Sequence, residues 1–195
     1  MLIFNRWNMD EVKVQDQGLV RYINLKPVVV PRSFGRNSGD FRKNDMSIVE
    51  RFMNKLMVTG HSGKRHKVSS GKFCGNYQTI IRETIKAFQI IESKTKKNPV
   101  QVLINAIENA ALYEEIAAYQ VGGIIARKAV ITSPQRRVDV ALRYMTQGIQ
   151  RSAFKSRKTL GDAIADELIA AANNDSKAMP IRERARIEKE AEGAR

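Results

Sequence analysis

The sequence predicts a mainly α-helical protein: a single helical domain of about six helices, with one protruding β-hairpin and an extended basic N-terminal arm. Apolar residues recur at helical spacing through most of the chain after residue 45. A Gly-Gly pair at 122–123 lies between two runs rich in β-branched residues, which is typical of a hairpin. The first 44 residues show no sustained helical period. We therefore divide the 195-residue chain into an arm, residues 1–44, and a helical domain, residues 45–195.

The arm is rich in proline, glycine and basic side chains. Pro27 and Pro31 enclose a short apolar run and argue against a strand in the middle of a sheet. We interpret the arm as a segment that becomes ordered on a partner, and an ordinary frayed terminus is the alternative. Its apolar patches indicate that at least part of it packs on the body. Its basic residues are Arg32, Arg36, Arg42 and Lys43.

Three helices are predicted before the hairpin. The first covers about 45–59, with Asp45 or Ser47 as its cap, and a loop of glycine, serine and basic residues follows. The second covers about 77–96. The third runs to about 111 and begins at Pro99, with Asn98 as cap. We expect their buried apolar residues to be Ile48, Val49, Phe52, Met53, Leu56, Met57, Tyr77, Ile80, Ile81, Ile85, Phe88, Ile91, Val100, Leu103, Ile104 and Ile107.

The hairpin is predicted over about 113–132, around Gly122-Gly123. A helix is the competing interpretation for 113–119, because Glu-Glu-Ile-Ala-Ala is a fair helix-forming run. Three further helices follow. Ser133 caps the first and Thr159 the second, which stops at Asn173-Asn174. The last begins near Pro180. It is charged nearly all round, so it needs a partner or a ladder of ion pairs to persist.

Charge is the strongest signal in the composition. The chain has 34 Lys and Arg against 20 Asp and Glu, a net charge of +14. Residues 32–72 hold ten basic and three acidic side chains, residues 127–158 hold nine and one, and the rest of the chain is close to neutral. Such clustering favours a nucleic acid as partner, with an anionic membrane surface as the main alternative. A single cysteine fits a reducing cytoplasm, and no apolar run approaches the ~20 residues of a membrane span, which argues against a membrane.

Catalytic and metal chemistry find little support in the sequence. His61 and His66 lie in a cationic loop without acidic neighbours, and Cys74 is the only cysteine, which argues against zinc. The chain has no phosphate-binding glycine loop and no nucleophile elbow. The pairs Glu114-Glu115 and Asp166-Glu167 are sequence neighbours, so their side chains point apart on regular structure. We expect neither an enzyme nor a cofactor nor a metal.

Two basic clusters are candidate nucleic-acid sites. Arg136 and Arg137 fall in the first turn of a helix, where cations are disfavoured unless an anion binds there, although both could simply face water. We expect the hairpin to bring Arg127 and Lys128 near that helix start. The loop after the first helix could follow a phosphate track, or be merely solvated. The candidate RNA-binding set is Arg32, Arg36, Arg42, Lys43, Lys64, Arg65, Lys67, Lys72, Arg127, Lys128, Arg136, Arg137, Arg143, Lys155, Arg157 and Lys158.

Several motifs, in order, resemble one known family. The chain is similar to the small-subunit ribosomal protein seven family in its archaeal and eukaryotic form, and the resemblance covers nearly all of it. The order of the motifs is more specific than any one of them. They are "RYINLKPVVVP", "IVERFMNKLMVTG", "GKR", "KNPVQVLINAIENAA", "VGGIIARKAVITSPQRRVDVALR", "FKSRKTL", "IADELIAAANNDSKA" and "IEKEAEGAR".

The resemblance implies a structural RNA-binding protein of the small ribosomal subunit. It implies binding to the 3′ domain of small-subunit ribosomal RNA, which becomes the subunit head, and an early role in head assembly. It places the hairpin beside the messenger path and the exit-site tRNA, and the last helix near that tRNA and a neighbouring ribosomal protein. By position, Lys64, Arg65, Arg136 and Arg137 should touch RNA, and the arm should lie along it. The rival is an architectural DNA-binding protein with a β-arm.

Overall fold

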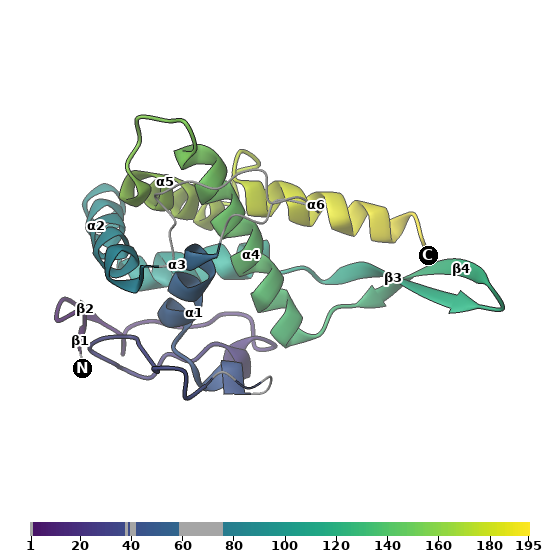
Figure 1. Ribbon diagram of the computed structural model, residues 1–195, viewed down its shortest axis with the longest axis horizontal. Helices are drawn as coiled ribbons and strands as arrows, with labels where there is room; N and C mark the ends of the chain where they lie inside the picture. The colour runs from purple at the N-terminus through teal and green to yellow at the C-terminus, as the bar shows by residue number, and fades with distance from the viewer. Residues whose placement is uncertain (1, 38, 40–41, 59–75) are drawn as a thin grey trace.

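The computed structural model describes residues 2–37, 39, 42–58 and 76–195. Within them the structure is mainly helical, as the sequence predicts, with one long hairpin and a short N-terminal strand pair (Figure 1). The elements in chain order are β1 (Leu2–Ile3), β2 (Trp7–Asn8), η1 (Val20–Tyr22), η2 (Arg42–Asp45), α1 (Ile48–Met57), α2 (Tyr77–Thr95), α3 (Pro99–Ala110), β3 (Glu114–Val121), β4 (Ile124–Ile131), α4 (Pro134–Ala153), α5 (Leu160–Ala172) and α6 (Met179–Glu192).

The body is organised around α5, against which α2, α3 and α4 all pack, while α1 closes the side formed by α2 and α4. α5 is rich in alanine, so its neighbours approach closely. Most of the predicted inward-facing residues are fully buried here, among them Phe52, Phe88 and Leu103. Met57, Tyr77, Ile81 and Ile85 are partly buried at the edge of the core.

Side-chain caps fix three of the predicted helix starts. At the start of α2, the Asn76 side chain accepts a hydrogen bond from the backbone N–H of Gln78. The Asn98 side chain accepts a hydrogen bond from the backbone N–H of Val100. Thr159 and Asp162 form a reciprocal capping box at the start of α5. Ser47 and Ser133 stand at the cap positions of α1 and α4, but neither side chain makes the capping hydrogen bond that the sequence led us to expect.

The hairpin is confirmed over its whole length, so the helical alternative for 113–119 does not hold. Glu114 pairs with Ile131 and Val121 with Ile124, leaving Gly122 and Gly123 as the two turn residues. Both glycines have positive φ, 55° and 87°, as a tight two-residue hairpin turn requires. The hairpin projects well beyond the body, and α6 runs beside its base (Figure 1).

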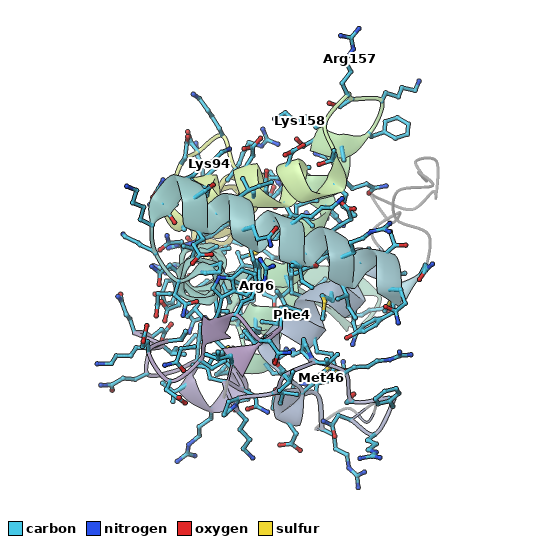
Figure 2. All side chains as sticks on the ribbon, turned by 90° about the vertical axis from the view of Figure 1, so that its left-hand side faces the viewer. Phe4, Arg6, Met46, Lys94, Arg157 and Lys158 are labelled. Atoms are coloured by element: carbon cyan, nitrogen blue, oxygen red, sulfur yellow. The ribbon has the colours of Figure 1, made fainter. Side chains whose placement is uncertain are left out.

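The first 25 residues differ from the extended arm that we expected. Ile3, Trp7, Leu19 and Ile23 are buried in the main core, so this part of the segment belongs to the body. The Trp7 indole N–H donates to the Glu92 carboxylate at 3.0 Å. The segment runs under α2 with Phe4 and Trp7 both edge-on to Phe88, so the packing that we predicted for part of the arm is extensive (Figure 2).

Ion pairs support the charged helix α6, which the sequence predicted to need them. Arg186 pairs with Glu183 and Glu190 along the helix. Arg184 pairs with Glu188 and also donates to the carbonyl oxygen of Asn109, which ties α6 to the end of α3.

Candidate nucleic-acid interface

The basic residues of the arm are divided between two places: Arg32 and Arg36 lie on a loop, and Arg42 and Lys43 lie in η2. Arg32, Arg36 and Arg42 are exposed and Lys43 is half-buried. The backbone N–H and hydroxyl of Ser33 both donate to one oxygen of Glu50 in α1, each at 2.7 Å. The chain around Arg32 is therefore held at a fixed place on the helical body.

Lys55 in α1 belongs with these cations, although sequence reasoning did not single it out. Burial lowers the pKa of its ammonium group, and the positive charges of Arg143, Lys43 and Arg51 lower it further, against the opposing effect of Asp139. Cations from the arm, α1 and α4 are thus close enough to repel one another. The available signal was a lysine beside an apolar stripe, which also describes many solvated lysines.

The basic surface continues along α4. Arg143, Gln147 and Arg151 are spaced four residues apart, so they lie on one face of the helix, and both arginines are exposed. The loop after α4 then carries the exposed side chains of Lys155 and Arg157. Figure 2 shows Arg157 projecting from this loop away from the body.

Lys158 differs from Lys155 and Arg157 because it forms an ion pair within the part of the protein that the structure describes. Its ammonium group lies 2.8 Å from Oδ2 of Asp166, and the ammonium group of Lys94 lies 2.9 Å from Oδ1 of the same residue. The hydrogen bond to Asp166 raises the pKa of Lys158. Burial pushes the pKa of Asp166 upward, but the two lysines outweigh it and hold that pKa below its usual value.

We call the exposed and half-buried cations along this path the cationic band. It starts on the arm, crosses the exposed end of α1, follows α4 and ends on the α4–α5 loop. Its members are Arg32, Arg36, Arg42, Lys43, Lys55, Arg143, Arg151, Lys155 and Arg157.

The start of α4 is not the open anion site that the sequence suggested. Arg136 donates from Nε and Nη2 to the two oxygens of Glu115, at 2.5 and 2.6 Å. This hydrogen bonding raises the pKa of the guanidinium. The positive charge that is disfavoured at a helix N-terminus is therefore balanced by a carboxylate at the hairpin base.

Arg137 is buried, which corrects the expectation that it faces a phosphate. Its Nε donates to the carbonyl oxygen of Leu112 at 2.9 Å and its Nη2 to Asp16 at 2.8 Å. The Tyr113 ring covers the guanidinium, with 4.4 Å between Cζ and the ring centroid. Since Arg137 is fully occupied within the protein, we remove it from the proposed contacts.

Arg127 and Lys128 are exposed on β4, but the hairpin carries them away from α4. They pair in register with Ala118 and Ala117, in the middle of the strand. Pro134 follows Lys128 by six residue steps of extended chain, a distance of about 20 Å. This corrects the expected grouping with Arg136. As neighbours on a strand, the two cations also point to opposite faces of the hairpin.

Four candidate cations, Lys64, Arg65, Lys67 and Lys72, lie outside the described residues, as do His61, His66 and Cys74. In the described part of the chain, no group of three or more His, Cys, Asp or Glu side chains is arranged to hold a metal ion. None of the helices described has the length and apolar character that crossing a membrane requires.

The structure combines a helical body, a projecting hairpin and a band of cations. These features are typical of basic proteins that serve a structural role in complexes with nucleic acids. Comparison with known proteins makes the class specific. The family model described as ribosomal protein S7p/S5e matches residues 19–195, and the chain belongs to this family. This membership confirms the resemblance seen in the sequence and the expectation of a structural protein rather than an enzyme.

Archaeal relatives match along essentially the whole chain. The small ribosomal subunit protein uS7 of Nanoarchaeum equitans is 43% identical over 196 residues, covering 100% of this chain and 99% of the relative. The proteins of the same name from Methanococcoides burtonii and Archaeoglobus fulgidus are each 43% identical, covering 99% and 100% of this chain and 98% and 95% of their own lengths. The similarity is therefore not confined to one motif or one element.

Proposed function

We propose that this chain is a structural constituent of the small ribosomal subunit that binds the 3′ domain of small-subunit ribosomal RNA and helps to nucleate the subunit head. The observation that carries the proposal is the cationic band, presented by a member of a ribosomal protein family. Its relatives are named as proteins of the small ribosomal subunit.

The proposed mechanism is electrostatic and geometric. Lys and Arg side chains neutralise phosphates and release counterions, which provides affinity without reading the bases. Because α4 is a rigid helix of 20 residues, about 30 Å long, it holds the two ends of the cationic band, on the arm and on the α4–α5 loop, at a fixed separation. RNA segments that touch both ends are thereby held in one relative orientation, which is what early assembly of a folded RNA domain requires.

The hairpin and α6 form the second part of the proposal. Both extend from the same side of the body (Figure 1). They can therefore contact partners that lie beyond the RNA bound by the body. Arg127 and Lys128 place two exposed positive charges on the hairpin beyond Glu114 and Glu115 at its base, and such charges suit RNA. We propose that the hairpin lies beside the messenger path and the exit-site tRNA, and that α6 approaches that tRNA and a neighbouring ribosomal protein.

A competition assay tests the RNA part of this proposal and separates it from the DNA-binding alternative. The full chain is bound to the 3′ domain of an archaeal small-subunit RNA, with excess duplex DNA or an unrelated structured RNA as competitor. We expect the 3′ domain to remain bound. Equal competition by duplex DNA would instead favour an architectural DNA-binding protein.

A charge-matched pair of variants tests the role of the band. Arg143→Gln with Arg157→Gln removes two positive charges from the band, and Arg82→Gln with Lys86→Gln removes two exposed positive charges from α2. Only the first variant should weaken binding strongly. If both weaken it equally, net charge rather than the position of the band governs binding.

A further inference from the structure

Phe34 is an aromatic side chain held on the outside of the protein. Its side chain is 73% exposed. It occupies a tight turn in which the Arg36 N–H donates to the Ser33 carbonyl oxygen at 3.1 Å, with positive φ at both central residues, 52° at Phe34 and 81° at Gly35. Asn, Asp and Gly are the usual residues at such positions, because a bulky side chain is strained there. Core packing does not account for a strained, exposed ring.

The turn is anchored on both sides, so the ring is presented rigidly. Besides the two hydrogen bonds from Ser33 to Glu50, the hydroxyl of Tyr77, the first residue of α2, donates to the carbonyl oxygen of Pro31. The turn is therefore attached to both α1 and α2.

A guanidinium group lies against the same ring. The Cζ atom of Arg32 is 4.5 Å from the ring centroid of Phe34 and 4.8 Å from that of Tyr77. Arg32 is exposed, and in the part of the chain that the structure describes no carboxylate forms an ion pair with it. An exposed aromatic face with a cation next to it suits a nucleotide, which has a flat base and an adjacent phosphate.

The ring also borders a large cavity. The cavity has a volume of about 770 Å³, and its lining includes Phe34, Tyr77 and Met57 as apolar surface and Lys43 and Lys55 as cations. It has room for a base and the sugar-phosphate next to it. A protein partner would need acidic groups to face these cations, whereas a polynucleotide brings phosphates at every residue.

We propose that Phe34 is a stacking platform for an unpaired base of the bound RNA, with Arg32 and Lys43 holding the phosphates on either side. This inference rests on the proposed RNA-binding function and adds a contact of a different kind. The cations of the band neutralise backbone charge, whereas the ring requires a base that has left its helix. The bound RNA must therefore offer a bulge or a single-stranded nucleotide at this point.

The test compares Phe34→Asn with the wild-type chain on the 3′ domain RNA, over a range of salt concentrations. Loss of base stacking should raise Kd about 5- to 150-fold. The slope of log Kd against log salt should not change, because stacking releases no counterions. Asn tolerates positive φ, so the melting temperature should be equal or higher, which keeps the result separate from misfolding.

Three further variants serve as controls. Phe34→Trp should retain wild-type affinity, because it keeps an aromatic face. Arg32→Gln should lower the steepness of the salt dependence. Val20→Ala, which shortens another exposed apolar side chain, should change nothing.

Two results for Phe34→Asn would overturn the proposal while leaving the RNA-binding function intact. One is wild-type affinity. The other is a weakened affinity with a shallower salt slope, which would mean that the ring only positions cations. If the wild-type chain fails to bind the 3′ domain at all, the proposed function itself is overturned.

Discussion

Arg136 and Arg137 are neighbours in the first turn of α4 but have different roles. Arg136 is about half exposed and pairs with Glu115, whereas Arg137 is buried against Asp16 and the Leu112 carbonyl. One arginine joins α4 to the hairpin base, and the other joins α4 to the N-terminal segment. Two cations at a helix start, which looked like an anion site, act as connections between segments.

Arg137→Ala should destabilise the fold strongly. It leaves the Leu112 carbonyl and Oδ2 of Asp16 without the donors that Arg137 supplies, at a cost of about 2–4 kcal/mol. Arg136→Ala is the matched control. It breaks a pair that is exposed on the arginine side and should cost ~1 kcal/mol or less. Urea unfolding of both variants measures the difference, and equal losses would contradict the structural role assigned to Arg137.

Glu167 gives the stability a pH dependence of its own. Burial raises the pKa of its carboxyl, even though it accepts a hydrogen bond from the Met179 N–H and lies near Arg182. The folded state therefore binds this proton more tightly than the unfolded state does. The resulting contribution to stability is present at acid pH and is lost as the pH rises from the ordinary glutamate pKa through the raised value.

Glu167→Gln removes that titration and keeps an oxygen to accept the Met179 N–H. Its free energy of unfolding, relative to wild type, should therefore improve as the pH rises from about 4 to 7. Unfolding curves at several pH values measure this difference. A difference that stays constant with pH would show that the burial of the carboxylate is not what limits stability here.

At the scale of elements, the helices and the hairpin could be predicted because their signals are local. Apolar spacing, Asn98-Pro99, Thr159 with Asp162 and the Gly122-Gly123 turn all act within a few residues. Apolar patches indicated that part of the N-terminal segment packs on the body, but they did not indicate against which residues. Its partners, such as Glu92 for Trp7, lie 85 residues away, and irregular chain has no period that reveals a buried face.

The difference between local and long-range signals also explains which predicted site residues are exposed and which are buried. Exposure of Arg143, Lys155 and Arg157 agrees with their positions on a helix face and in a loop. Burial of Arg137 depends on Asp16, which lies 121 residues earlier in the chain, and no local pattern contains that information. The role of Lys55 likewise depends on charges from two other segments.

Trp7→Ala should show that the N-terminal segment is part of the core. The side chain is buried and contacts Phe88 in α2, so its removal should cost about 3–5 kcal/mol. Thermal and urea unfolding measure the loss. If the free energy of unfolding falls by less than ~1 kcal/mol, the segment is instead an arm that becomes ordered only on a partner.

The outer half of the hairpin should behave in the opposite way. Replacing residues 118–127 with Asn-Gly joins Ala117 to Lys128, which are partners in register at a hydrogen-bonded position of the ladder, through a favourable two-residue turn. The removed side chains that the structure describes lie beyond the body, so stability should change by less than ~1 kcal/mol. A large loss in the same unfolding assay would show that the outer half supports the fold.

At the scale of the whole molecule, the important property is the rigid separation of the two ends of the cationic band. The body is held together by a shared core, by α5 at its centre and by the arginine connections to the hairpin and the N-terminal segment. Cations on such a body cannot adjust independently to different phosphates. Affinity for a folded RNA should then depend on both ends being engaged at once.

This expectation can be tested by neutralising the ends separately and together. One variant carries Arg36→Gln and Arg42→Gln, and the other carries Lys155→Gln and Arg157→Gln. On the intact 3′ domain, the losses in log Kd should add in the combined variant, because the sites are far apart. Each removed phosphate contact should lower the salt slope by about 0.7–0.9.

RNA fragments of the 3′ domain complete the argument. A fragment that reaches only one end of the band should be sensitive to one pair of substitutions and indifferent to the other. The intact domain should bind more tightly than either fragment, because the second contact becomes intramolecular once the first has formed. If the combined variant loses no more affinity than the pair of substitutions with the larger effect loses alone, the ends do not engage one RNA together. The body would then act as a carrier of charge and not as a device that orients RNA.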